Sequence, residues 1–109
     1  MAYDELLAKR INELIEGKKG FMCKEMFGGV AYLLNGNMCV GVHKNELIIR
    51  YDPKIDEEIR ADKNVHPFDI TGRPMKGWSL VKGEGIKGND LKKWFDLSLN
   101  FAKTLPPKK

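Results

Sequence analysis

The sequence predicts an α+β fold, a two-layer sandwich in which helices pack against a mostly antiparallel sheet. Apolar residues recur at helical spacing near both ends of the chain, and short runs rich in β-branched and aromatic residues fill the part between them. Glycine-containing turn signals separate those runs. The expected order of elements is α-β-β-β(β)-α-β-β-α. With 109 residues, 42% of them hydrophobic and 31% charged, the chain has the composition of one globular domain, which we place at residues 1–105.

The first element is an amphipathic helix over residues 3–17. Leu7, Ile11 and Leu14 recur at helical spacing, and charged residues occupy most of the remaining surface. Asp4 and a neighbouring glutamate fall in the first turn, where the positive end of the helix dipole favours carboxylates. Gly17 is a suitable residue for the C-terminal stop.

Residues 22–51 predict a meander of antiparallel strands. The strongest turn signal is Asn35-Gly36, because both residues tolerate the positive φ that a twisted two-residue hairpin requires. In the run that follows, alternation places Leu47, Ile49 and Tyr51 on one face of the sheet.

The second half of the chain predicts two more helices and two more strands. Asp52 followed by Pro53 reads as an N-cap and first helical position, opening a helix that ends near residues 63–64. Two prolines confine any strand around residues 68–70 to an edge of the sheet or to a short length. Residues 78–82 predict the last strand.

The final helix is expected over residues 89–105, and its apolar residues cover an arc of roughly 200°. One sheet face cannot bury an arc of that width. Part of it, including Leu97 and Phe101, is therefore expected to meet another helix or another chain. Residues 106–109, with two prolines and two lysines, predict a disordered basic tail.

Charge and composition exclude several classes of protein. The formal net charge is +4, but three of the positive charges lie in the last seven residues, so the body of the domain is nearly neutral. No apolar run approaches the roughly 18 residues that a membrane span needs, and the N-terminus does not read as a signal peptide. Two cysteines are too few for a disulfide scaffold, so we expect a cytoplasmic protein with buried thiols.

Residues 83–88 spell G-x-G-x-x-G between a strand and a helix, as a dinucleotide-binding fingerprint does. A Rossmann unit also needs a second parallel strand, and only a helix and a proline-rich tail follow Gly88. We interpret the segment as a flexible connection. A small-molecule binder or an enzyme centred on this loop stays as an alternative.

The residue types that carry catalysis or bind metals form no convincing group. Cys23, Cys39, His43 and His66 are the only thiol and imidazole ligands, and their spacing does not favour one zinc site. No serine lies in a G-x-S-x-G turn. We therefore expect no catalytic residue, no cofactor and no metal, and thus no enzyme.

One loop is a better candidate for contact with a partner. It holds Arg73, Lys76 and Trp78 close together among two glycines and a proline. Arginine offers a rigid fork of donors that suits a carboxylate or a phosphate, and Arg50 is a second arginine of interest. The alternative is a purely structural role, in which Arg73 holds its own loop in place by binding a carboxylate or backbone carbonyl groups. A nucleic-acid-binding accessory that uses this loop and the lysine-bearing last helix is the second alternative function.

Two motifs resemble the TfoX N-terminal domain. One is M-F-G-G followed by an N-G turn, and the other is T-G-R-P-M-x-G-W. The residues that carry the resemblance are Met26, Phe27, Gly28, Gly29, Gly36, Thr71, Gly72, Arg73, Pro74, Gly77 and Trp78. The likeness extends over nearly the whole chain. The residues also have a structural interpretation, since the paired glycines suit a bulge or tight turn between two strands.

The resemblance implies a two-layer α/β fold, no catalysis, and a family named for bacterial regulators that promote transcription of DNA-uptake genes. TfoX regulators carry a second, helical domain that these 109 residues do not include, so we expect a stand-alone N-terminal domain. The resulting hypothesis is a non-enzymatic regulatory module that acts by protein contact. Its expected partner is an unidentified protein, with the transcription machinery as one class. A homodimer that buries the apolar arc of the last helix is a further expectation.

Overall fold

The fold was analysed in a computed structural model, which describes residues 3–26, 29–68 and 76–107. In chain order the elements are α1 (Glu5–Ile15), β1 (Phe21–Met26), β2 (Gly29–Leu34), β3 (Asn37–His43), β4 (Glu46–Arg50), the 3-10 helix η1 (Pro53–Ile55), α2 (Asp56–Arg60), β5 (Val65–Pro67), β6 (Trp78–Val81), the 3-10 helix η2 (Gly83–Gly85) and α3 (Asp90–Ala102). This order confirms the predicted α+β arrangement.

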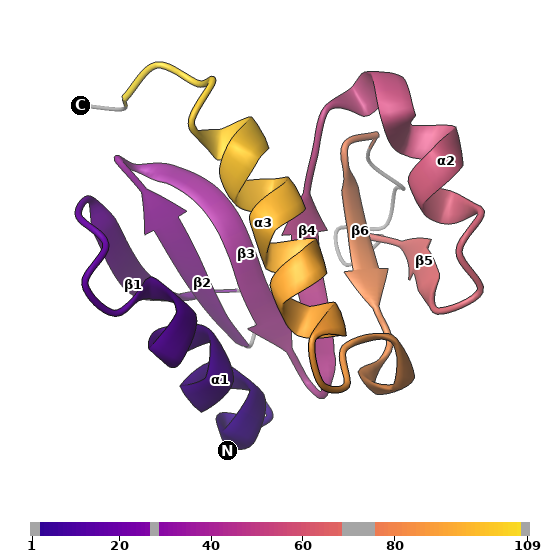
Figure 1. The fold of residues 1–109 in the computed structure, drawn as a ribbon, viewed down its shortest axis with the longest axis horizontal. Coiled ribbons are helices and arrows are strands. Elements are labelled where there is room, and N and C mark those ends of the chain that lie inside the picture. Colours follow the sequence, from indigo (N-terminus) through magenta and orange to yellow (C-terminus); the bar gives the residue numbers. More distant parts are fainter. Residues whose placement is uncertain (1–2, 27–28, 69–75, 108–109) are drawn as a thin grey trace.

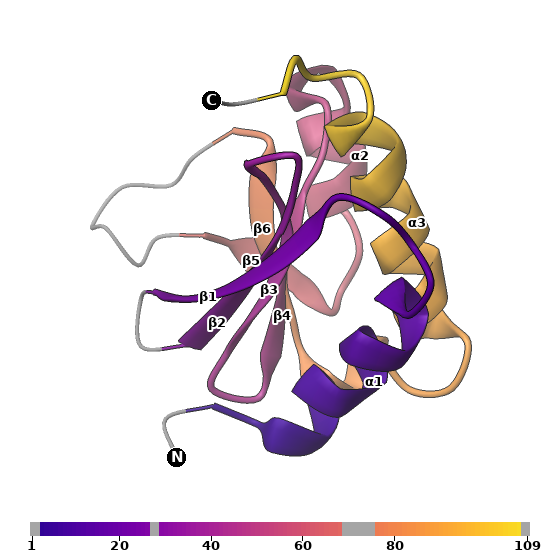
Figure 2. The same ribbon diagram turned by 90° about the vertical axis from the view of Figure 1, so that its left-hand side faces the viewer.

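The strands form one open six-stranded sheet in the order β1-β2-β3-β4-β6-β5, and every neighbouring pair is antiparallel. Figure 1 shows α3 running across the middle strands, with α1 beside one half of the sheet and α2 beside the other. Turned by 90°, all three helices lie on the same face (Figure 2). The sheet therefore has one helix-covered face and one face without helices.

The first half of the chain follows its local signals closely. The Asp4 side chain accepts hydrogen bonds from the backbone N–H groups of Leu6 and Leu7, so Asp4 is the N-cap and not a residue of the first turn. The expected start at residue 3 was therefore wrong, and the helix begins at Glu5. At the β2–β3 hairpin, Asn35 and Gly36 have φ of 52° and 86°, which confirms the predicted two-residue turn.

Two helix ends in the second half differ from the prediction. The helix after Pro53 ends at Arg60, because the Asp62 side chain accepts from the Asn64 N–H and turns the chain toward β5. A short edge strand lies at Val65–Pro67, whereas residues 69–70 of the region predicted to hold such a strand lie outside the described residues. The last helix ends at Ala102, after which the chain makes tighter i→i−3 hydrogen bonds.

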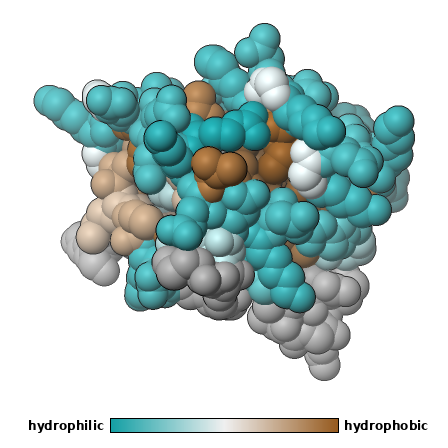
Figure 3. Space-filling model, turned by 90° about the horizontal axis from the view of Figure 1, so that it is seen from below, coloured by the Kyte–Doolittle hydropathy of each residue, from teal (hydrophilic) through white to brown (hydrophobic). Residues whose placement is uncertain are grey.

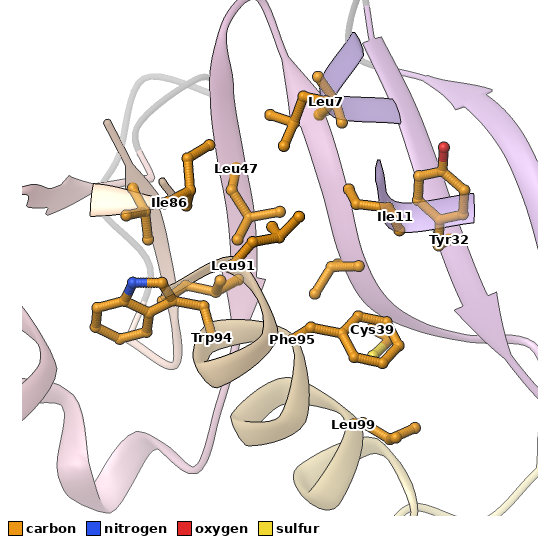
Figure 4. Packing of buried hydrophobic residues seen from close by; sticks show 14 of the residues in the cluster. Leu7, Ile11, Tyr32, Cys39, Leu47, Ile86, Leu91, Trp94, Phe95 and Leu99 are labelled. Atoms are coloured by element: carbon orange, nitrogen blue, oxygen red, sulfur yellow. The ribbon is translucent and has the colours of Figure 1, made fainter. Parts of the chain in front are cut away.

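The main hydrophobic core lies between the helices and the sheet. Figure 4 shows Trp94 and Phe95 of α3 and Ile11 of α1 pointing into it toward the strands. The Tyr32 hydroxyl donates to the Ala8 carbonyl oxygen and fixes α1 against β2. A smaller core lies on the opposite face and consists of Ala31, Met38, Ile48, Phe68 and Leu80. The prediction that Leu47, Ile49 and Tyr51 share one face is confirmed, since all three belong to the main core.

No helix within residues 3–26, 29–68 and 76–107 combines the length and the apolar character that crossing a membrane requires. The underside of the molecule in Figure 3 is mostly hydrophilic, and hydrophobic side chains show there in small areas between polar ones. Leu6 and Met22 are the large hydrophobic residues of the described chain that stand most exposed, at 74% and 68%.

Candidate functional site

A groove lies between α2 and α3 on the described surface, and it has an apolar floor. Its volume is about 630 Å³, within the range of sites that hold a ligand or a partner side chain. The lining residues come from two helical segments and are Ile55, Glu58, Ile59, Asp62, Lys93, Trp94, Asp96, Leu97 and Asn100. We call this surface the α2–α3 groove.

One wall of the groove is a stripe of α3, and the other runs from the end of η1 through α2 to the turn that follows it. Residues 55, 58, 59 and 62 have the spacing i, i+3, i+4 and i+7, and so do residues 93, 96, 97 and 100. Ile55, Ile59 and Leu97 pack at the border of the main core and stay partly exposed. Apolar side chains thus form the middle of the groove, with polar side chains along its rim.

A buried polar network holds α2 in position beside the sheet. The Asp56 carboxylate accepts hydrogen bonds from the Tyr51 hydroxyl (2.7 Å) and the Gly77 N–H (3.2 Å), and it pairs with Arg60 at 3.1 Å. The Tyr51 hydroxyl also lies 2.6 Å from the Ser79 hydroxyl. Burial raises the pKa of Tyr51 above its ordinary value, so the hydroxyl keeps its proton at neutral pH. The network joins the first turn of α2 to β4 and β6.

The rim of the groove carries more negative than positive charge. Glu58, Asp62 and Asp96 contribute carboxylates, and Lys93 contributes one ammonium group. Asp96 pairs with Lys92 at 2.8 Å in an exposed ion pair. The Lys93 ammonium lies 4.8 Å from the centre of the Trp94 ring, in a cation–π arrangement.

A second cluster lies where β4 ends and β6 begins, and it includes Phe101 near the end of α3. The Arg50 guanidinium carbon is 4.9 Å from the centre of the Trp78 ring and 5.6 Å from that of Phe101. One of its nitrogens donates to the Met38 carbonyl oxygen at 3.4 Å. No carboxylate of the described residues pairs with it. Burial lowers the pKa of Arg50 below its ordinary value, but the group stays a cation at physiological pH.

The predicted contact loop is only partly visible. Lys76 is exposed, and Trp78 is half-buried beside Arg50 and Phe68. Thr71, Gly72, Arg73 and Pro74 lie outside the described residues, as do Phe27 and Gly28. The structure therefore brings Trp78 together with Arg50 and Phe101, and the role predicted for Arg73 stays a prediction.

Close packing and backbone conformation explain why two of the described motif positions are glycine. A Cβ on Gly29 would lie 1.9 Å from the Val42 carbonyl oxygen, so only glycine allows β2 and β3 to approach this closely. Gly77 has φ of +85°, and a Cβ there would lie 3.0 Å from the Tyr51 carbonyl oxygen. Met26 is the last residue of β1. For these positions the motif describes backbone packing.

The G-x-G-x-x-G segment is a connection with its own hydrogen bonds, and its predicted flexibility stays a prediction. Residues 83–85 form η2, and the Trp94 indole N–H donates to the Gly85 carbonyl oxygen at 3.0 Å. Arg10 donates to the carbonyl oxygens of Ile86 (2.7 Å) and Gly88 (3.2 Å). These carbonyl groups point at side chains of α1 and α3, which explains the segment without a nucleotide.

The cysteines and histidines remain separate. Both cysteines are free, with Cys23 exposed and Cys39 buried, so the expectation of a buried thiol was wrong for Cys23. Burial raises the pKa of Cys39 to about 12, against the weaker opposing effect of Arg50. His66 pairs with Glu46. No three metal-ligating side chains of the described residues converge.

Leu97 and Phe101 do not lie free on the surface as the helix pattern alone suggested. Leu97 packs at the border of the core and faces the α2–α3 groove, and Phe101 lies against Arg50. Sequence reasoning missed Ile55, Glu58, Ile59 and Asp62 as the opposite wall. Their i, i+3, i+4, i+7 spacing was the signal that could have revealed it.

The described part of the expected tail touches the sheet. The Asn37 side-chain amide donates to the Pro106 carbonyl oxygen at 2.8 Å. Lys108 and Lys109 lie outside the described residues.

Comparison with known protein families identifies a match over most of the chain. Residues 13–102 match the family described as the TfoX N-terminal domain. No curated protein and no solved structure matches the chain.

Proposed function

This chain belongs to the TfoX N-terminal domain family, and we propose that it is a non-enzymatic regulatory module that acts by contact with a protein partner. The α2–α3 groove supports the proposal, because its apolar floor is left open between two helices. The family resemblance makes proteins of the transcription machinery the first class of partner to examine.

The buried polar groups also favour a module without catalysis. The Tyr51 hydroxyl bonds to both Asp56 and Ser79 inside the domain, and none of the three lines the groove. A catalytic group must reach a substrate within hydrogen-bond distance. These three groups instead hold α2 and β6 to β4, which is a structural task.

The test is affinity capture from the native cell with the full chain as bait. We expect a retained protein whose recovery falls at least about tenfold with Leu97→Glu, because a carboxylate in the groove cannot be buried without a partner. Leu6→Glu is the matched control, since Leu6 is 74% exposed on α1 and away from the groove.

Leu97 is partly buried, so its variant needs a check on folding by circular dichroism. Asn100→Arg supplies a second variant, because Asn100 is exposed and its replacement adds bulk to the groove without disturbing the core. Equal recovery with all four baits, or no retained protein, would overturn the proposal.

A second candidate function is binding of nucleic acid by the surface around Arg50. The supporting observation is that Arg50 lies beside Trp78 without a carboxylate partner among the described residues, and that Lys76 close by is exposed. This function predicts affinity that falls steeply as salt rises and weakens with Lys76→Glu. Absence of binding at low salt would exclude it.

A further inference from the structure

We infer that the α2–α3 groove receives an amphipathic helix with a positively charged rim, supplied by a partner protein. The inference rests on the proposed function and adds to it the chemistry of the partner. It follows from the pattern of the groove walls, their length and their charge.

The apolar part of the groove has the pattern of a helix-binding site. Ile55 and Ile59 are one helical turn apart on one wall, and Leu97 lies on the other wall beside Trp94. A third helix laid between α2 and α3 would place residues at i, i+3, i+4 and i+7 against these side chains. Partners that bind in this way supply leucine-like anchors at that spacing.

The length of the groove suits a short helix. The α3 residues that line it run from 93 to 100, which corresponds to about 12 Å of helix. α3 packs on β3 and β4, whereas α2 packs on β5, so the groove lies between helices that cover different strands. A partner helix of about two to three turns has a matching length.

The charge of the rim decides which helix fits. Glu58 has no ion pair among the described residues, and Asp96 is held only by an exposed pair with Lys92. An exposed pair of this kind exchanges partners at little cost in free energy. The rim is acidic although the whole chain has a formal net charge of +4. The carboxylates of the rim therefore attract a lysine- or arginine-bearing helix to the groove.

The experiment titrates the full chain with two designed helical peptides of about 14 residues. Both carry leucines at i, i+3, i+4 and i+7; one carries lysines at its remaining positions and the other glutamates. Binding is measured by calorimetry, and its location by amide chemical shifts. We expect the lysine peptide to bind at least about tenfold more tightly and to shift resonances of α2 and α3.

Charge-reversal variants localise the effect. Glu58→Lys should weaken binding of the lysine peptide at least about fivefold, because it removes one rim carboxylate and adds a like charge. Glu84→Lys is the matched control, since Glu84 is also exposed but lies in η2 outside the groove. Equal losses for the two variants would show a general charge effect and overturn the inference.

The remaining outcomes separate this inference from the proposed function. Tighter binding of the glutamate peptide at the groove would overturn the inferred positive charge of the partner, although the groove would remain a contact surface. The groove resonances could also shift with protein concentration alone, with a dimer seen in light scattering. That result would identify a second copy of the chain as the occupant and would overturn the inference. Binding of neither peptide would also overturn it, while the Leu97→Glu capture result would still decide the proposed function.

Discussion

Asp56 is the residue on which the position of α2 depends most. Asp56 is buried, with a relative exposure of 7%. Its carboxylate has a hydroxyl, a backbone N–H and a guanidinium as partners. A buried carboxylate is tolerated only with such partners, because an unpaired charge in the interior is costly. The same network fixes the Tyr51 hydroxyl and the start of β6.

Replacing Asp56 by Ala should lower the free energy of unfolding by about 2–3 kcal/mol, because it leaves the Tyr51 hydroxyl and the Gly77 N–H without their acceptor. Urea unfolding followed by circular dichroism measures this. Glu57→Ala, one residue further along the same helix and exposed, is the control and should change the stability little. Equal values for the two variants would contradict the role of the network.

Cys39 makes the stability depend on pH in the alkaline range. Burial raises its pKa from 9.0 to about 12, so above pH 9 the unfolded chain releases a proton that the folded chain retains. The unfolded state then binds fewer protons, and stability falls as pH rises. We expect a loss of about 1 kcal/mol from this group between about pH 8 and about pH 10.

Urea unfolding at the two pH values tests this. Cys39→Ala should show a shallower loss than the parent chain, and the exposed Cys23 provides the control substitution. The buried Tyr32 and Tyr51, whose pKa values burial also raises, account for part of the loss that remains. An identical pH dependence in the Cys39→Ala chain would refute the assignment.

At the scale of elements, packing around the connection between β6 and α3 decides where that connection needs a glycine. Gly85 is buried, and a Cβ there would lie 2.7 Å from Asn64 Cβ and 2.8 Å from Val81 Cγ1. Gly83 has only the Asn45 carbonyl oxygen nearby, at 3.7 Å. The two glycines share a motif, but only one of them is required by packing.

Gly85→Ala should therefore destabilise the domain by about 1–3 kcal/mol through overpacking, whereas Gly83→Ala should have an effect near zero or be slightly stabilising. Thermal unfolding of both variants measures the contrast. A ranking in the opposite order would contradict the packing argument and reopen the question of what the motif does.

The molecule as a whole is a sheet with a core on each face. The helix side holds the larger core, and five buried residues form the smaller one on the other side. The principal extents of 32, 30 and 28 Å describe a nearly isometric body. Because the same strands contribute to both cores, neither can be lost while the sheet persists.

The two tryptophans test this cooperativity. Trp94 belongs to the helix-side core and Trp78 packs against the other one. In single-tryptophan chains made with Trp78→Phe or Trp94→Phe, the fluorescence transition should coincide with that of circular dichroism in each chain. Separate midpoints would show that the two sides of the sheet unfold independently.

The expected homodimer is also a property at this scale, and it stays a prediction. Its argument was the broad apolar arc of the last helix. Within one chain, Leu97 borders the core and Phe101 lies against Arg50, so less of that arc is left over than the pattern implied. Light scattering at roughly tens of micromolar protein decides whether the chain is a monomer or a dimer.

The sequence by itself determined the class of fold, the order of the elements and the family. These follow from local physics: the spacing of apolar residues, the Asn35-Gly36 turn and the proline after Asp52 act over a few residues each. Local signals also located most element boundaries to within a few residues. They failed where a side-chain hydrogen bond set the boundary of an element, as the bond accepted by Asp62 does after α2.

Only the tertiary structure decided which surfaces lie together. The walls of the α2–α3 groove are separated by more than thirty residues in the chain, and the partners of Asp56 come from both sides of it. It also showed that Gly85 serves packing, because the atoms that forbid a side chain there belong to Asn64 and Val81. Contacts between distant segments depend on how the helices settle on the sheet, and no local pattern of residues encodes that.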